Sequence, residues 1–229
     1  MTQPVYLTPD HPSYPTGLRT TFPAGQAPTL SLLGDQNLLN QPALALFCSV
    51  KCPGDLILNT YDLAQTLREA NIPVMSGFHS PMEKECLRLL LRGTQAVLHC
   101  PARSLEGIRL SPGQKQAIQT GRLLLLSPFP APQRRATAAL AERRNQVVGA
   151  IALASFMAYA SPGGKTEAFA QNLIAQGKPL FTFESPNTEN LLALGAKAVT
   201  PPTAPSHWHS LLKEIPSRNQ EKPNQIVES

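Results

Sequence analysis

Three groups of residues in this sequence have types and spacings that could do chemistry. A glycine turn leads directly into a lysine and a threonine at 163–166, and an arginine pair precedes an asparagine at 143–145. Turn amides and guanidinium groups both bind phosphates. The third group could ligate a metal ion and consists of Cys48, Cys52, His79, His99 and Cys100.

The glycine turn Gly163-Gly164-Lys165-Thr166 is similar to the end of a phosphate-binding P-loop. A P-loop places a glycine six residues before its lysine, but Tyr159 stands at that position. No predicted strand ends in the aspartate that would steady a metal ion. These departures disfavour an ATPase and leave two interpretations open, a plain turn before a helix and a phosphate-binding loop without hydrolysis. The sequence also has no GxGxxG motif, which disfavours an NAD or FAD dehydrogenase.

The cysteines and histidines do not form a recognisable metal or catalytic pattern. Cys48 and Cys52 lack the second paired knuckle of a structural zinc site, and no base with an orienting partner is identifiable beside either thiol. Four cysteines in a chain of 229 residues are also too few for a disulfide framework. We therefore expect free cysteines, no metal, no cofactor and no catalytic residue.

The charge of the chain permits a polyanionic partner without requiring one. The sequence has 20 basic and 15 acidic side chains, a formal charge of +5 and an isoelectric point near 9.2. Arg134, Arg135, Arg143 and Arg144 gather in one short segment. A solvated helix face would explain them, but guanidinium groups close to a glycine turn would also hold phosphates through paired hydrogen bonds.

The elements that must position these groups alternate between short apolar runs and segments of helical period, which is typical of a mainly parallel sheet. We expect strands at 43–49, 73–76, 95–99, 122–127, 153–160, 180–183 and 196–199. Helices are expected at about 56–71, 80–93, 111–121, 136–151, from the glycine turn to 176, and at 188–194. Two of them open with capping boxes, at Ser80 and at Ser111. The fold class is therefore α/β, with a doubly wound sheet of about six or seven strands and helices on both faces.

Proline content sets the expected boundaries. Residues 1–40 form a proline-rich lead-in with little regular structure, 41–200 the folded domain, and 201–229 a proline-rich tail without a core, disordered from 217 onward. Within this tail Trp208 is expected to act as one aromatic anchor. No apolar run reaches the roughly 20 residues that span a bilayer, and an apolar signal segment is lacking at 1–12, so we expect a cytoplasmic protein.

From about residue 10 to residue 200, the order of motifs resembles the DprA/Smf family of DNA-processing, or recombination-mediator, proteins. In residues 43–51, where the family has a strand ending in Gly-Ser-Arg, Val50 replaces the arginine and Lys51 follows as a substitute. The other segments that carry the resemblance are His11-Pro12-Ser13-Tyr14-Pro15-Thr16-Gly17-Leu18, Leu33-Gly34-Asp35-Gln36-Asn37-Leu38-Leu39, Val74-Met75-Ser76-Gly77, Arg143-Arg144-Asn145-Gln146-Val147-Val148-Gly149-Ala150 and residues 184–196.

The resemblance implies a Rossmann-like domain that binds single-stranded DNA without catalysis, delivers it to the RecA recombinase during natural transformation, and forms a homodimer. The winged-helix-like module of many relatives has no counterpart in this sequence. With the position of the loops at the strand ends, the resemblance predicts a phosphate-binding site made of Lys51, Ser76, Gly77, Arg143, Arg144, Asn145, Gly163, Gly164 and Lys165.

Two alternatives remain open. Pro162-Gly163-Gly164 also resembles the Pro-Gly-Gly-x-Gly-Thr-x-x-Glu loop of lysine-decarboxylase-like nucleotide phosphoribohydrolases, which are enzymes on a similar sheet. Here the second Gly-Thr is missing and Glu167 comes too early, which leaves the catalytic glutamate unplaced. The other alternative is a nucleotide-sensing domain without turnover.

Overall fold

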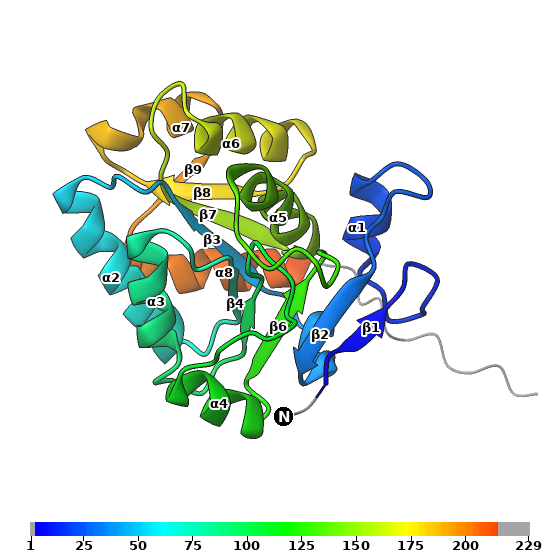
Figure 1. Cartoon of the computed structure of the whole chain (residues 1–229). Coiled ribbons are helices and arrows are strands. Elements are labelled where there is room, and N and C mark those ends of the chain that lie inside the picture. The colour runs from blue at the N-terminus through cyan, green and yellow to red at the C-terminus, as the bar shows by residue number, and fades with distance from the viewer. Residues whose placement is uncertain (1–2, 215–229) are drawn as a thin grey trace, which may run out of the picture.

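A single sheet with helices on both faces organises the chain (Figure 1), as a computed structural model covering residues 3–214 shows. The strands are β1 (Val5–Leu7), β2 (Leu30–Gly34), β3 (Leu44–Cys48), β4 (Val74–Ser76), β5 (Val97–His99), β6 (Leu123–Ser127), β7 (Ala154–Tyr159), β8 (Leu180–Phe183) and β9 (Lys197–Val199). The α-helices are α1 (Thr16–Thr21), α2 (Gly54–Glu69), α3 (Pro81–Leu90), α4 (Pro112–Gln119), α5 (Ala138–Ile151), α6 (Lys165–Ala175), α7 (Glu189–Ala193) and α8 (Ala204–Glu214). Short 3-10 helices occupy Gln36–Asn40, Pro186–Thr188 and Pro201–Thr203.

The strands lie in the order β1-β2-β6-β5-β4-β3-β7-β8-β9. Strands β3 to β9 are parallel, and the chain winds from β3 through β4 and β5 to β6 before it returns to β7 on the other side of β3. The expected α/β, doubly wound, mainly parallel sheet is confirmed. The winding direction reverses between β3 and β7, which is the position where open α/β sheets bind ligands.

Each face of the sheet buries its own apolar core. One face packs against α1, α5, α6 and α7, with Leu18, Val147 and Leu173 among the buried side chains. The other face packs against α2, α3, α4 and α8, with Leu63 and Cys86 among them. Both faces of the parallel strands are covered (Figure 1), which is why these strands are apolar runs without polar alternation.

The expectation of little regular structure in residues 1–40 is wrong. Strands β1 and β2 form an antiparallel pair, and β2 also pairs antiparallel with β6, so the segment extends the sheet on one side (Figure 1). Leu30 and Leu32 on β2 are buried in the core. They reach the core because alternate residues of a strand point to the same face. Within residues 3–214 the sheet therefore has nine strands instead of about six or seven.

The expectation that the residues from 201 onward carry no core is also wrong for the described part, 201–214. These residues form a 3-10 turn and helix α8, which packs against α2 and the same face of the sheet. Trp208 is only 3% exposed. The prolines here occupy the first turns of helical segments, where the missing N–H costs nothing. The disorder expected from 217 onward lies outside the described residues.

Candidate functional site

A cleft of about 330 Å³ opens at the carboxyl ends of the central strands, where the winding direction reverses. Its walls come from the β3–α2 loop, the start of α3, one side of α5 and the first turns of α6. The polar and charged side chains of its lining include Glu83, Glu142, Arg144, Asn145, Lys165 and Thr166.

Glu83 fills the place where a ligand anion could sit between β3 and β4. Its Oε1 accepts the N–H of Cys48 at 3.0 Å, and its Oε2 accepts those of His79 at 2.7 Å and Ser80 at 3.3 Å. The Ser80 side chain in return accepts the N–H of Glu83, which completes the capping box expected from the sequence. Backbone N–H groups of both strand ends are therefore satisfied by a carboxylate of the chain itself.

Arg144 lies beneath the cleft and is 3% exposed. Its Nε donates to Asn145 Oδ1 at 2.7 Å and its Nη1 to the Cys100 carbonyl at 3.3 Å. Within residues 3–214 no carboxylate lies within ion-pair distance of this guanidinium. Gly77 makes the position possible, because a Cβ on this glycine would stand 1.1 Å from Arg144 Nη1. Arg144, Asn145 and Gly77 thus form one unit, with Arg144 as its single charge.

Arg143 points away from this unit. Its guanidinium lies 4.0 Å from the centre of the Phe22 ring and donates to the Gln26 carbonyl at 3.4 Å. Arg143 is not among the residues that line the cleft. The two neighbouring arginines, predicted to act together, therefore face different surroundings: Arg144 the cleft and Arg143 the amino-terminal segment.

The glycine turn does not offer its own amides to a ligand. The Gly163 N–H donates to Glu167 Oε2 at 2.7 Å, and the Gly164 N–H donates to the Ser161 carbonyl at 2.9 Å. Lys165 and Thr166, the first two residues of α6, line the cleft instead. No side chain caps the amino terminus of this helix. Lys165 Nζ forms an ion pair with Glu142 across the opening.

The remaining predicted residues lie near the cleft without lining it. Lys51 is exposed on the β3–α2 loop, next to Val50, which does line the cleft. Ser76 is fully buried, and its hydroxyl donates to the Leu46 carbonyl at 2.7 Å and accepts the Phe78 N–H at 3.2 Å. The structure thus brings Arg144, Asn145 and Lys165 into one cleft, places Gly77 directly behind it, and leaves Lys51 at its rim.

The cysteine and histidine group ranges from the buried Cys48 and Cys100 to the exposed His79. Within residues 3–214, no three side chains of His, Cys, Asp or Glu are arranged to hold a metal ion. Burial raises the pKa of the Cys100 thiol to about 12, and burial together with the Arg144 charge lowers the pKa of His99 to about 4. Both groups are therefore neutral near pH 7.

Sequence reasoning missed several residues of the cleft. The capping box predicted at Ser80 accounts for Glu83 only as a partner of that serine, whereas the bond from the Cys48 N–H to Glu83 joins residues 35 positions apart and leaves no local pattern. Glu142, Thr166 and Phe169 also line the cleft. A recognisable signal existed only for Thr166, which follows the glycine turn at the start of a helix.

The doubly wound sheet and a strand-end cleft at its reversal point define a Rossmann-like α/β protein. The family model for DNA recombination-mediator protein A matches residues 5–205. The chain belongs to this family. None of the curated protein sequences matches the chain.

Solved structures show the same fold. DNA processing protein A from Helicobacter pylori, solved in work on its single-stranded DNA binding mode, superposes with a TM-score of 0.71 at 19% identity and covers 92% of this chain and 97% of its own. DNA processing protein A from Streptococcus pneumoniae superposes with a TM-score of 0.71 at 18% identity, and the match covers 86% of this chain and 71% of that protein's chain. The molybdenum cofactor binding protein from Rippkaea orientalis superposes with a TM-score of 0.54 at 10% identity, and the match covers 75% of this chain and 98% of that protein's chain.

Within residues 3–214, no helix combines the length and the apolar character needed to cross a membrane.

Proposed function

We propose that the chain binds single-stranded DNA at the strand-end cleft, without catalysis, as a recombination mediator. The observation that carries the proposal is Arg144, a nearly buried cation without a carboxylate partner in the described chain, at the wall of a cleft that faces the start of α6. A helix amino terminus and a guanidinium together favour a phosphate. Membership of the recombination-mediator family and the binding mode named for the Helicobacter pylori protein support this proposal.

The proposal includes the partners implied by the family. We infer that the DNA is passed to the RecA recombinase, in natural transformation or another recombination pathway, and that the protein acts as a cytoplasmic homodimer. Co-migration of a complex of the chain with RecA and DNA, and the mass of the free chain in solution, test these two inferences separately.

Glu167 is the residue on which we base the proposal that the protein has no catalytic activity. This is the carboxylate nearest to the position required by the phosphoribohydrolase alternative, and both of its oxygens are engaged, one by the Gly163 N–H and the other by the Asn190 side chain. Glu167 is also not among the residues that line the cleft, so it is not placed to act on a ligand held there. An assay for release of free base from nucleoside monophosphates distinguishes the two functions, and turnover would overturn the proposal.

The cleft is tested by placing a negative charge in it without harming the fold. Thr166→Glu adds a carboxylate in the first turn of α6, where a negative charge stabilises the helix by about 0.3–1 kcal/mol. It also repels a phosphate in the cleft. We expect at least tenfold weaker binding of an unstructured oligonucleotide by fluorescence anisotropy, with an unchanged or higher melting temperature.

The matched control is Gln176→Glu, which places the same charge at the opposite end of α6. It should leave the affinity within about twofold. Equal weakening by both variants would show that the field of the whole protein, and not the cleft, governs binding. Absence of binding by the unmodified chain at low salt would overturn the function itself and favour the nucleotide-sensing alternative.

A further inference from the structure

Two loops beside the cleft carry a group of arginines that the proposed site does not use. The β5–α4 loop contributes Arg103 and Arg109, and the β6–α5 loop contributes Arg134 and Arg135. We call these four side chains the loop-arginine surface. Arg109, Arg134 and Arg135 are exposed, and Arg103 is half-buried.

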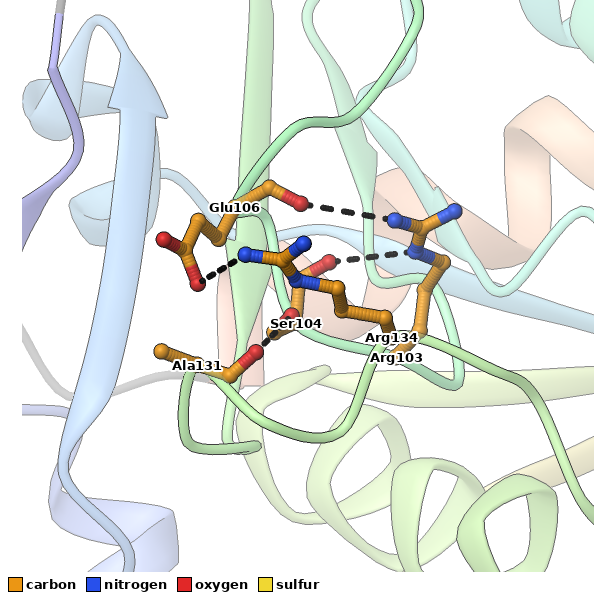
Figure 2. A network of polar contacts seen from close by, with 5 residues as sticks. All are labelled: Arg103, Ser104, Glu106, Ala131 and Arg134. Atoms are coloured by element: carbon orange, nitrogen blue, oxygen red, sulfur yellow. Dashed lines mark hydrogen bonds and ion pairs between the residues drawn. The ribbon is translucent and has the colours of Figure 1, made fainter.

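The two loops are held together by a network of polar contacts (Figure 2). The Ser104 hydroxyl donates to the Ala131 carbonyl at 3.1 Å, and the Ser104 N–H donates to the Gln133 carbonyl at 2.7 Å. Arg134 pairs with the Glu106 carboxylate at 3.3 Å, on the same short segment whose carbonyls accept from Arg103. The network therefore fixes the two loops, and the Arg103 and Arg134 guanidinium groups, relative to each other.

The surface has a strong positive excess. Residues 101–111 and 128–137 contain four arginines and a single acidic residue, Glu106. Arg109 and Arg135 have no carboxylate within ion-pair distance in the described part of the chain. Both side chains are thus free to meet an anion from solution.

The cleft lacks such an excess. Its lining includes two cations, Arg144 and Lys165, and two carboxylates, Glu83 and Glu142, so the formal charges sum to zero although Arg144 has no ion-pair partner in the described chain. Lys165 is already paired with Glu142. Attraction of a polyanion over more than a few ångströms must therefore come from another part of the molecule, and the loop-arginine surface is the adjoining one.

The surface is continuous with the cleft. Arg135 precedes Ala138, which lines the cleft, by three residues, and three residues span at most about 10 Å of extended chain. This separation is about one Debye length at physiological salt. A strand with a phosphate in the cleft would therefore pass within reach of these arginines.

We propose that the loop-arginine surface is a second phosphate-binding surface, which holds the backbone of single-stranded nucleic acid where the strand leaves the cleft. The inference rests on the proposed function, since it takes the strand in the cleft as its starting point. The arginines contact only phosphates, so binding here is independent of base sequence. Each phosphate they neutralise adds about 0.7 to the slope of log affinity against log salt.

The test combines Arg109→Gln and Arg135→Gln, because these two side chains take no part in the loop network and the fold should be kept. With a 20-nucleotide oligonucleotide we expect the salt slope to fall by about 1.4 and the affinity at 0.1 M salt to fall by about fivefold per lost contact. With a dinucleotide, whose single phosphate cannot occupy the cleft and the loop-arginine surface together, the affinity should stay within about twofold. The control combines Arg88→Gln and Arg92→Gln, which remove equal charge from the carboxyl end of α3, the end that points away from the cleft. This control should change the binding of neither oligonucleotide by more than twofold.

An unchanged slope with the long oligonucleotide would overturn the inference, as would equal losses in the control pair or with the dinucleotide. These results differ from failure of the proposed function. If the unmodified chain binds and Thr166→Glu weakens it while the loop variant does not, only the second surface is wrong. If the loop variant loses binding and Thr166→Glu does not, the cleft is wrong and the arginines are the main site. If the unmodified chain binds no oligonucleotide at low salt, both proposals fail.

Discussion

The Arg144 guanidinium rests directly against the backbone of Gly77, so closely that any side chain at residue 77 would occupy its place. The contact joins the end of β4 to α5 and holds a charge under the cleft without a carboxylate to neutralise it. A buried charge is costly unless its hydrogen bonds are satisfied. The Cys100 carbonyl and the Asn145 amide provide those bonds and leave the charge available to the cleft.

Gly77→Ala is therefore expected to displace Arg144. The added Cβ would meet three atoms of the guanidinium within 2.6 Å, and overpacking of this kind costs about 1–3 kcal/mol. We expect that loss of unfolding free energy in urea, together with weaker binding of single-stranded DNA. Gly113→Ala is the control, since a Cβ there meets nothing nearer than 3.9 Å. Equal stability of the two variants would show that Arg144 moves aside without cost.

Arg143 is expected to stabilise the amino-terminal segment. Its guanidinium packs on the Phe22 ring, and a cation–π contact contributes about 0.5–1 kcal/mol at such sites. A double-mutant cycle of Arg143→Met and Phe22→Leu, followed by urea unfolding, should give a coupling energy of that size. Additive effects within about 0.3 kcal/mol would show that the contact does not stabilise the fold.

The difference between Arg143 and Arg144 shows what the sequence could predict at the site. The pair, the helix that carries it and the neighbouring strand ends all follow from local patterns. Adjacent helical residues point about 100° apart, so only one of the two can face the cleft. Which one does depends on the packing of the segment around Phe22, and that segment was not expected to fold against α5.

The same difference between local patterns and tertiary packing explains which parts of the fold could be predicted from the sequence. Apolar runs and capping boxes such as those of Ser80 and Ser111 are local, and the seven parallel strands and the helices between them were predicted within a few residues. The pairing of β2 with β6 joins residues about 95 positions apart. It cannot be read from the proline-rich composition of the segment, because the burial of Leu32 that stabilises it is a tertiary effect.

Trp208 is expected to be a major source of stability, in contrast to the prediction that the residues from 201 onward carry no core. Truncation of a fully buried tryptophan costs about 3–5 kcal/mol. Trp208→Ala should therefore lower the unfolding free energy by this amount in urea, and a chain ending at residue 203 should melt several degrees lower. His209→Ala is the neighbouring exposed control. Unchanged melting of the truncated chain would show that α8 is not needed by the core.

The stability of the protein should fall in mildly acidic solution because of His99. Burial is the main cause that lowers its pKa from 6.5 to about 4, the positive charge of Arg144 lowers it further, and a backbone hydrogen bond to Gly77 opposes them. Between these two pKa values the unfolded chain binds a proton at this residue and the folded chain does not, so stability decreases as pH falls from 6.5 towards 4. From pH 7.5 to pH 4.5 the expected loss is about 2–3 kcal/mol. Carboxylates also titrate near the lower end of this range, so the loss is measured against His99→Gln by urea unfolding at several pH values. The stability difference between the two chains should shift by that amount, in favour of the variant at low pH, and a difference independent of pH would show that His99 keeps an ordinary pKa in the folded protein.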